Sequence, residues 1–231
     1  DKAGLDERRI HELRAFEEYG NFTILSSLWP TNWLDSELSA LLVTPFVLKG
    51  KTIGIVGINT AWLSRDEKDK EYLSPGIDLL ESTLNTIINC DLRILLGHHP
   101  VDWLSLKHRA RIQNILGDHK VLYLHGHLHE NRAQPMETGG GRFLQIQSGA
   151  AFNVLEHDET AWENGLLWAE VDLDLTTIRL RPRYWKSKER RWGIADDFHE
   201  DHRVDDNWWA YPLPNTPEFE NKTNTRKNEV Q

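Results

Sequence analysis

The amino-acid sequence predicts an α/β fold, with mixed sheets flanked by helices, on three observations. Two short aliphatic runs, at residues 92–96 and 121–124, are each followed by turn residues, as strands buried in a parallel sheet often are. A segment with apolar residues at helical spacing separates the two runs. Strand-like segments follow from residue 142 onward.

Composition limits the function classes. The 231 residues are 39% hydrophobic and 27% charged, which is ordinary for a globular protein. A formal net charge of -9 argues against general attraction to nucleic acid or to an anionic membrane. No apolar stretch approaches the roughly 20 residues that span a bilayer. The single cysteine, Cys90, fits a reducing compartment, so we expect a cytoplasmic protein without disulfides.

The N-terminal part begins with a predicted helix. Residues 6–19 are charged and carry apolar side chains at helical spacing, and a glycine follows them. Two apolar runs, at 41–48 and 53–58, are separated by the short polar segment 49–52. This pattern predicts a β-hairpin.

Alternating helices and strands are predicted in the middle of the chain. Ser74 and Pro75 are a typical capping residue and first helical residue, and an apolar helix face follows them. Residues 106–116 have the length of a crossover helix, and Gly117 suggests its end. A strand, a helix and a strand in this order favour a right-handed parallel unit, whose strand ends open onto one edge of the sheet.

The last part of the chain predicts a second, largely antiparallel sheet. Its strand-like segments are 142–147, 165–173 and 176–184. We therefore expect one domain over residues 1–185. Residues 186–231 are expected to form a polar, tryptophan-containing extension that is partly disordered.

Two histidine clusters follow the two aliphatic runs. The first is Gly97-His98-His99-Pro100, and the second is His125-Gly126-His127-Leu128-His129. Neutral imidazoles are ligands for Zn, Fe, Mn, Co or Ni, and side chains two residues apart on an extended segment point the same way. Gly126 is expected to let the backbone turn tightly. The clusters therefore predict part of a metal site at the edge of the sheet.

The spacing of these clusters resembles the last two motifs, GH and GHxH, of the calcineurin-like metallophosphoesterases. The similarity covers residues 41–184. It implies the C-terminal half of a four-layer αββα sandwich that hydrolyses a phosphomonoester or phosphodiester, with a small molecule or nucleotide as substrate. By motif position, His98 and His127 would bind the second of two divalent metal ions and His129 the first. His99 would be an outer-shell or substrate-side histidine and the catalytic residue of this chain.

The sequence departs from this family before the first cluster. Residues 1–96 contain no DxH, GDxxD or GNHD motif, so the bridging aspartate and other ligands are missing. The chain begins at Asp1 and its only methionine is Met136, so we expect a fragment whose site is completed by an upstream segment of the same protein. Alone, it is expected to bind metal weakly and to be inactive or weak. The DxH match at residues 197–199 is interpreted as chance.

Other residues have simpler interpretations. His125 and Asn59 are expected to be structural, and Trp103 is expected near the mouth of the site. The basic stretch 181–191 is interpreted as a solvated edge strand, which makes nucleic acid an unlikely partner. The alternative to an enzyme is a noncatalytic remnant or interaction module that retains the fold.

Overall fold

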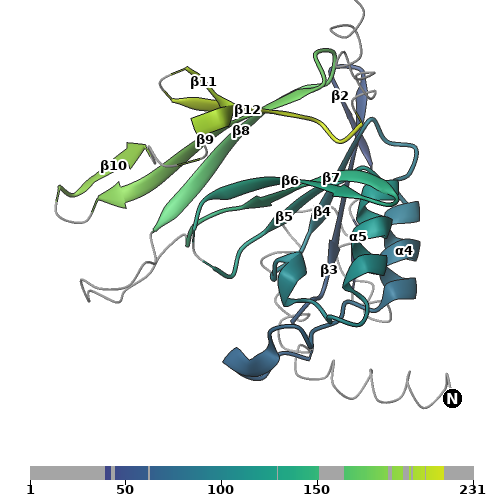
Figure 1. The fold of residues 1–231 in the computed structure, drawn as a ribbon. Helices are drawn as coiled ribbons and strands as arrows, with labels where there is room; N and C mark the ends of the chain where they lie inside the picture. The colour runs from purple at the N-terminus through teal and green to yellow at the C-terminus, as the bar shows by residue number, and fades with distance from the viewer. Residues whose placement is uncertain are drawn as a thin grey trace, which may run out of the picture.

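The computed structural model describes residues 40–42, 45–61, 63–128, 130–150, 164–186, 189–194, 198, 200–205 and 207–215. These residues form two helices, two β-sheets and three short 3-10 helices, arranged in layers (Figure 1). The helix expected over residues 6–19 lies outside the described residues. Within these ranges, neither α-helix has the length and apolar character that a bilayer crossing requires.

The first sheet has seven strands. They are β1 (Ala40–Leu42), β2 (Phe46–Leu48), β3 (Lys51–Ile58), β4 (Leu92–Leu96), β5 (Leu122–His125), β6 (Arg132–Thr138) and β7 (Gly141–Gln147). Their order is β1-β3-β4-β5-β7-β6, and β2 also pairs with β3. The four central strands run parallel, whereas β1, β2 and β6 are antiparallel to their neighbours.

The predicted hairpin is present between β2 and β3. Lys49 and Gly50 both have positive φ, as a two-residue hairpin turn requires. The apolar run 41–48 is nevertheless two strands and not one. β1 and β2 pair with opposite ends of β3, and Pro45, which has no N–H to donate, directly precedes β2.

Two helices cover one face of this sheet (Figure 1). α4 (Ile77–Asn85) begins after Gly76, whose N–H donates to Ser74 Oγ at 3.2 Å. Ser74 therefore caps the turn before the helix, and the helix starts two residues later than Pro75. α5 (Arg109–Asp118) contains Gly117, which was expected to end it.

Gly117 has a packing role instead. A Cβ at this position would lie 2.2 Å from Thr138 Oγ1 and 3.0 Å from the Gly141 carbonyl. Glycine therefore allows α5 to approach the β6–β7 turn closely. The helix-side core beneath α4 and α5 includes Leu80, Ile112 and the sheet residue Leu95, all essentially fully buried.

The second sheet contains five strands. They are β8 (Gly165–Asp172), β9 (Thr177–Lys186), β10 (Arg191–Ile194), β11 (Arg203–Asp205) and β12 (Trp208–Pro212). β8 pairs along one side of β9, while β12 and β10 pair with successive parts of its other side. All these pairings are antiparallel, as predicted for this part of the chain.

The prediction that residues 142–147 belong to this second sheet is wrong. They form β7, which pairs parallel with β5 in the first sheet. Phe143 contacts the helix-side core, whereas Leu144 and Ile146 face the second sheet. A strand buried on both faces belongs in the interior of the layered structure, which explains its central position.

The expected boundary at residues 185 and 186 falls inside β9. Beyond it, β12 inserts Trp209 and Tyr211 into the core between the sheets, where Leu213 is also fully buried. The described part of the predicted extension is therefore integral to the fold. Phe198 joins the same core, while its neighbours 197 and 199, the ends of the DxH match, lie outside the described residues.

The two sheets pack face to face. Ile53, Leu122 and Leu144 of the first sheet meet Ile178 and residues of β12 in the second. The described residues thus form three layers: helices, first sheet and second sheet. The second helix layer of the expected αββα sandwich is not among them.

Replacement of Trp209 tests whether the C-terminal segment is structural. Trp209 has 0% exposure, so Trp209→Ala should lower the free energy of unfolding by about 3–5 kcal/mol in denaturant titrations. Trp168 of the same sheet is 64% exposed, and Trp168→Ala should change stability by less than about 0.5 kcal/mol. Equal effects of the two substitutions would contradict the burial of β12.

Candidate metal centre

The first sheet brings the two histidine clusters together. His98 and His99 follow β4, and His127 follows the neighbouring parallel strand β5. Two backbone hydrogen bonds extend the pairing past the strand ends: Gly97 N–H donates to Leu124 O at 3.0 Å, and Gly126 N–H donates to His98 O at 3.2 Å. The prediction that both clusters open onto one edge is confirmed.

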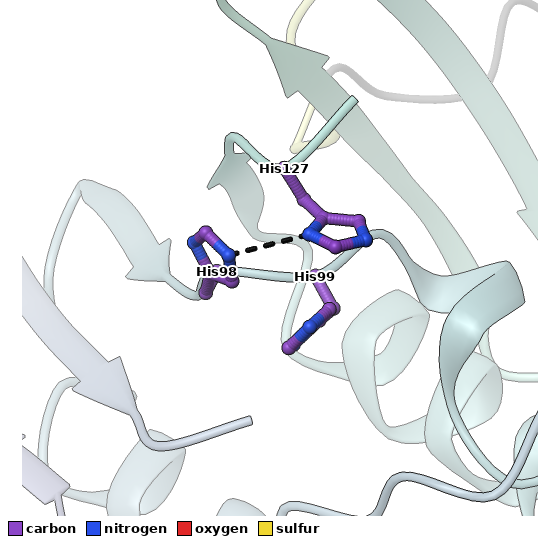
Figure 2. A group of neighbouring side chains, drawn as sticks. All are labelled: His98, His99 and His127. Carbon is purple, nitrogen blue, oxygen red and sulfur yellow. Dashed lines mark hydrogen bonds between the residues drawn. The ribbon is translucent and has the colours of Figure 1, made fainter. Parts of the chain in front are cut away.

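His98, His99 and His127 form a compact group (Figure 2). One ring nitrogen of each lies within 4.8 Å of the others, so the group could hold a metal ion. His98 Nε2 and His127 Nδ1 lie 3.3 Å apart. Nitrogens bound to one tetrahedral zinc ion at about 2.0–2.1 Å lie roughly 3.3 Å from each other. Without a metal, this separation suits one N–H···N hydrogen bond between the two rings. With a metal bound, it suits two nitrogen ligands on one ion.

Thr60, which follows β3, orients His99. Its Oγ1 accepts the backbone N–H groups of His98 and His99 at 3.2 and 3.1 Å, which occupies both hydroxyl lone pairs. The third contact of Oγ1, with His99 Nδ1 at 3.0 Å, must then use the hydroxyl proton. In the tautomer assigned by this network, Nδ1 is the acceptor and Nε2 carries the proton. With the proton at Nε2, His99 donates a hydrogen bond there; the opposite tautomer leaves Nε2 bare as a ligand atom, which its place in the three-histidine group allows.

Burial keeps the His99 ring neutral. The residue is only 2% exposed, and desolvation, followed by the nearby His127 and His98, lowers its pKa to about 4. At neutral pH the ring therefore carries no charge that would repel a cation. It can hold a proton at Nε2 and donate it to a hydrogen bond.

Trp103 forms one wall of the group. It lies in the 3-10 helix η3 (Val101–Trp103), which starts just after the first cluster. Its ring stacks on His99 with centroids 5.7 Å apart and meets His127 edge-on at 4.0 Å. The aromatic residue expected near the mouth of the site therefore contacts two of its histidines.

His127 lies in a tight turn. Leu128 N–H donates to Gly126 O at 3.1 Å, and the φ of His127, between them, is 75°. An i to i+2 hydrogen bond with this φ is the mark of a γ-turn, a strained conformation that non-glycine residues rarely adopt. Gly126, expected to allow the turn, does not have positive φ, and a Cβ there would meet nothing within 4 Å. The strained position is occupied by the histidine itself.

The remaining predicted residues have other positions. His125 is buried outside the three-histidine group, and its Nδ1 lies 3.0 Å from Gly126 O. Asn59 Oδ1 accepts the Ala61 N–H at 2.9 Å, which agrees with its predicted role in a turn. His129 lies outside the described residues, so its predicted bond to the first metal stays a prediction.

Sequence reasoning missed two supporting residues. One is Thr60, the second residue after β3. Its place could have indicated a role, because β3 adjoins β4 in the sheet. The other is Tyr123 of β5, whose hydroxyl donates to His99 O at 2.5 Å. Burial raises the pKa of Tyr123 far above its usual range, so the hydroxyl keeps its proton. No sequence motif marks a tyrosine that faces the core.

Comparisons with known proteins leave the family open. No family model and no curated protein matches the sequence. Among solved structures, the fold resembles Vps29 of Chaetomium thermophilum at 10% sequence identity and a TM-score of 0.29. The match covers 74% of this chain and 61% of that one, so the chain spans about three fifths of Vps29. A likeness this weak assigns neither family nor activity.

Replacement of Gly97 tests its close contact with Tyr123, the residue that hydrogen-bonds to the His99 carbonyl. An added Cβ would lie 2.4 Å from Tyr123 Oη and 2.9 Å from its ring, with no free space around the tyrosine. Gly97→Ala should therefore cost about 1–3 kcal/mol of stability in denaturant titrations. Gly126→Ala is the matched control, because a Cβ there meets nothing. A Gly97→Ala protein as stable as this control would contradict the contact.

Because His99 and His125 are buried as neutral rings, the folded protein should lose stability at acidic pH. Desolvation lowers the pKa of His99 and of His125 to about 4, below the 6.5 of the unfolded chain. The unfolded state then binds more protons, so stability falls as the pH drops from 6.5 toward 4. Between pH 7 and pH 4.5 the loss should be about 2 kcal/mol for each ring.

This loss is measured by urea titration in EDTA across the pH range. His125→Gln, which removes one of the two rings, should reduce the pH dependence by about half. An unfolding free energy that stays constant down to pH 4.5 would contradict the burial of neutral rings.

Proposed function

We propose that this chain supplies part of a dinuclear metal centre that hydrolyses a phosphomonoester or phosphodiester. The observation that carries the proposal is the 3.3 Å separation of His98 Nε2 and His127 Nδ1 at the ends of two parallel strands. This spacing suits two ligands of a single ion. In the resemblance to calcineurin-like metallophosphoesterases, the same two positions share the second metal.

His99 has a different part in the proposed mechanism. Its Nδ1 accepts a hydrogen bond from Thr60, so a proton is held at Nε2 within the histidine group. A neutral donor there suits the oxygen of a phosphate ester, on which negative charge grows during hydrolysis. We therefore assign His98 and His127 to metal binding and His99 to the substrate side.

The rest of the centre must come from other residues. Among the described residues, the group that could hold a metal contains imidazoles only. Two divalent cations about 3.5–4 Å apart need bridging anionic ligands, which neutral histidines cannot provide. We propose that His129 and an upstream segment of the same protein complete the site. Mn, Fe, Zn, Co and Ni all suit such ligands, and when bound they would polarise the phosphate and activate a water.

The imidazole-only group also favours a second candidate. A chain that kept the fold and lost the acidic ligands would be a noncatalytic interaction module. Metal binding and hydrolysis must therefore be measured separately.

Calorimetric titration with Zn²⁺ and Mn²⁺ tests the metal assignment. The chain should bind one ion, and His98→Ala or His127→Ala should each weaken binding at least about tenfold, because each removes a direct ligand. His99→Gln should leave metal affinity within about twofold. His108→Ala is the control, because His108 is half-buried at the start of α5 and lies outside the cluster. Unchanged binding in the first two variants would contradict the assignment.

Hydrolysis of an aryl phosphodiester with added Mn²⁺ then separates the two candidates. A longer chain with the upstream segment should turn over faster than this chain, and His99→Gln in the longer chain should reduce kcat by about 100-fold or more, since general acid–base groups contribute about 10²–10⁴-fold. Equal, near-zero turnover in both chains, with metal binding intact, would establish the noncatalytic module.

A further inference from the structure

A pocket of about 260 Å³ lies immediately beside the histidine group. Pro100 and Leu128, which line it, are the chain neighbours of His99 and His127. Its floor is the helix-facing side of β5, β7 and β6, and η3 and α5 contribute to its walls. The pocket is below the roughly 300–1,000 Å³ typical of sites for drug-sized ligands, so it suits one compact group.

The floor of this pocket is lined by polar side chains, whereas the adjacent positions on the same strands carry the apolar side chains of the core. On the same face, one step back along the strands, Tyr123 and Phe143 are fully buried in the helix-side core. Toward the strand ends the floor changes to His125, Gln145 and Gln147. Gln134 of β6 lies opposite Gln145 and extends this polar row. Glutamines and a histidine in these positions require partners, because buried polar groups without them are costly.

His125 shows that one partner is missing. Its Nδ1 lies 3.0 Å from the Gly126 carbonyl and must donate to it, so the neutral ring keeps a bare acceptor at Nε2. The residue is 6% exposed, and no described donor reaches Nε2. Less than 1 Å² of this atom is accessible, so it lies behind the surface of the pocket and is not presented to a ligand.

The two central glutamines offer both kinds of hydrogen bond. Gln145 Oε1 accepts the Val101 N–H at 3.2 Å, which directs its NH₂ group to other partners. Gln147 Nε2 donates to Glu130 O at 3.0 Å, which directs its Oε1 to other partners. The floor thus presents one donor group and one acceptor.

The walls define the rest of the ligand. Val101, Leu128 and Met136 supply apolar surface, which suits the faces of a flat ring. Arg132 and Asp102 place opposite charges at the rim, so the pocket does not favour a charged group. Glutamine amides pair with the adjacent donor and acceptor atoms on the edge of a nucleobase. A neutral heterocycle with apolar faces and such an edge suits the apolar walls and the glutamine floor.

We propose that this pocket binds a nucleobase, held by Gln134, Gln145 and Gln147. The inference deepens the proposed function. One part of it rests on that function: the bound base would belong to a nucleotide ester whose phosphate reaches the metal. It predicts nucleotides, and not sugar phosphates, as the substrate class. Binding of the base itself requires no metal.

The test is binding of adenosine, guanosine, cytidine and uridine to the chain in EDTA, followed by NMR or calorimetry. At least one nucleoside should bind, whereas ribose and inorganic phosphate should not. Gln134→Leu should weaken this binding about tenfold, because it removes an amide from the half-buried edge of the pocket. Glu137→Gln on the same strand is exposed and outside the pocket, so it should leave affinity unchanged.

Metal binding separates this inference from the proposed function. His98→Ala should weaken Zn²⁺ binding and leave nucleoside binding intact, and Gln134→Leu should have the opposite effect. Nucleoside binding without metal binding would overturn the proposed function alone. No binding of any nucleoside, or binding of ribose as tight as that of nucleosides, would overturn the nucleobase pocket.

Discussion

Parallel pairing of β3, β4 and β5 is the constraint on which the site depends. Because the three strands run the same way, the residues that follow them emerge at one edge of the sheet. Thr60, the two histidines after β4 and His127 come from distant parts of the sequence, yet they share this edge. The helices between the strands cover one face of the sheet. The second sheet covers the other face, so the edge rests on a core buried from both sides.

Within the site, Thr60 orients His99. Thr60 uses its two lone pairs on the backbone of the first cluster and its proton on the imidazole. The same residue therefore holds both the backbone of the first cluster and the orientation of the His99 ring. A valine at position 60 would have a similar shape and would supply none of these bonds. Tyr123 holds the same segment by donating a hydrogen bond from its hydroxyl to the His99 carbonyl.

From the sequence alone, the position of the histidine site could be predicted more accurately than the packing of the strands and helices. The strand at 92–96, its parallel partner and the meeting of the clusters were predictable, because aliphatic runs followed by polar turns mark buried parallel strands. The sheet to which residues 142–147 belong was not, because local alternation does not specify a partner strand. Gly117 looked like a helix end, since its close approach to the β6–β7 turn is a tertiary contact. The burial of Trp209 likewise depends on strands far from it in sequence.

The γ-turn at His127 has a consequence for how such proteins diverge. Left-handed φ is inexpensive for glycine and asparagine and costs other residues roughly 1 kcal/mol or more. A lineage that no longer used the ring would gain stability by exchanging it for one of these. Glycine or asparagine at this position would relax the backbone and remove the imidazole in one step, so backbone relaxation and metal binding are opposed at this residue.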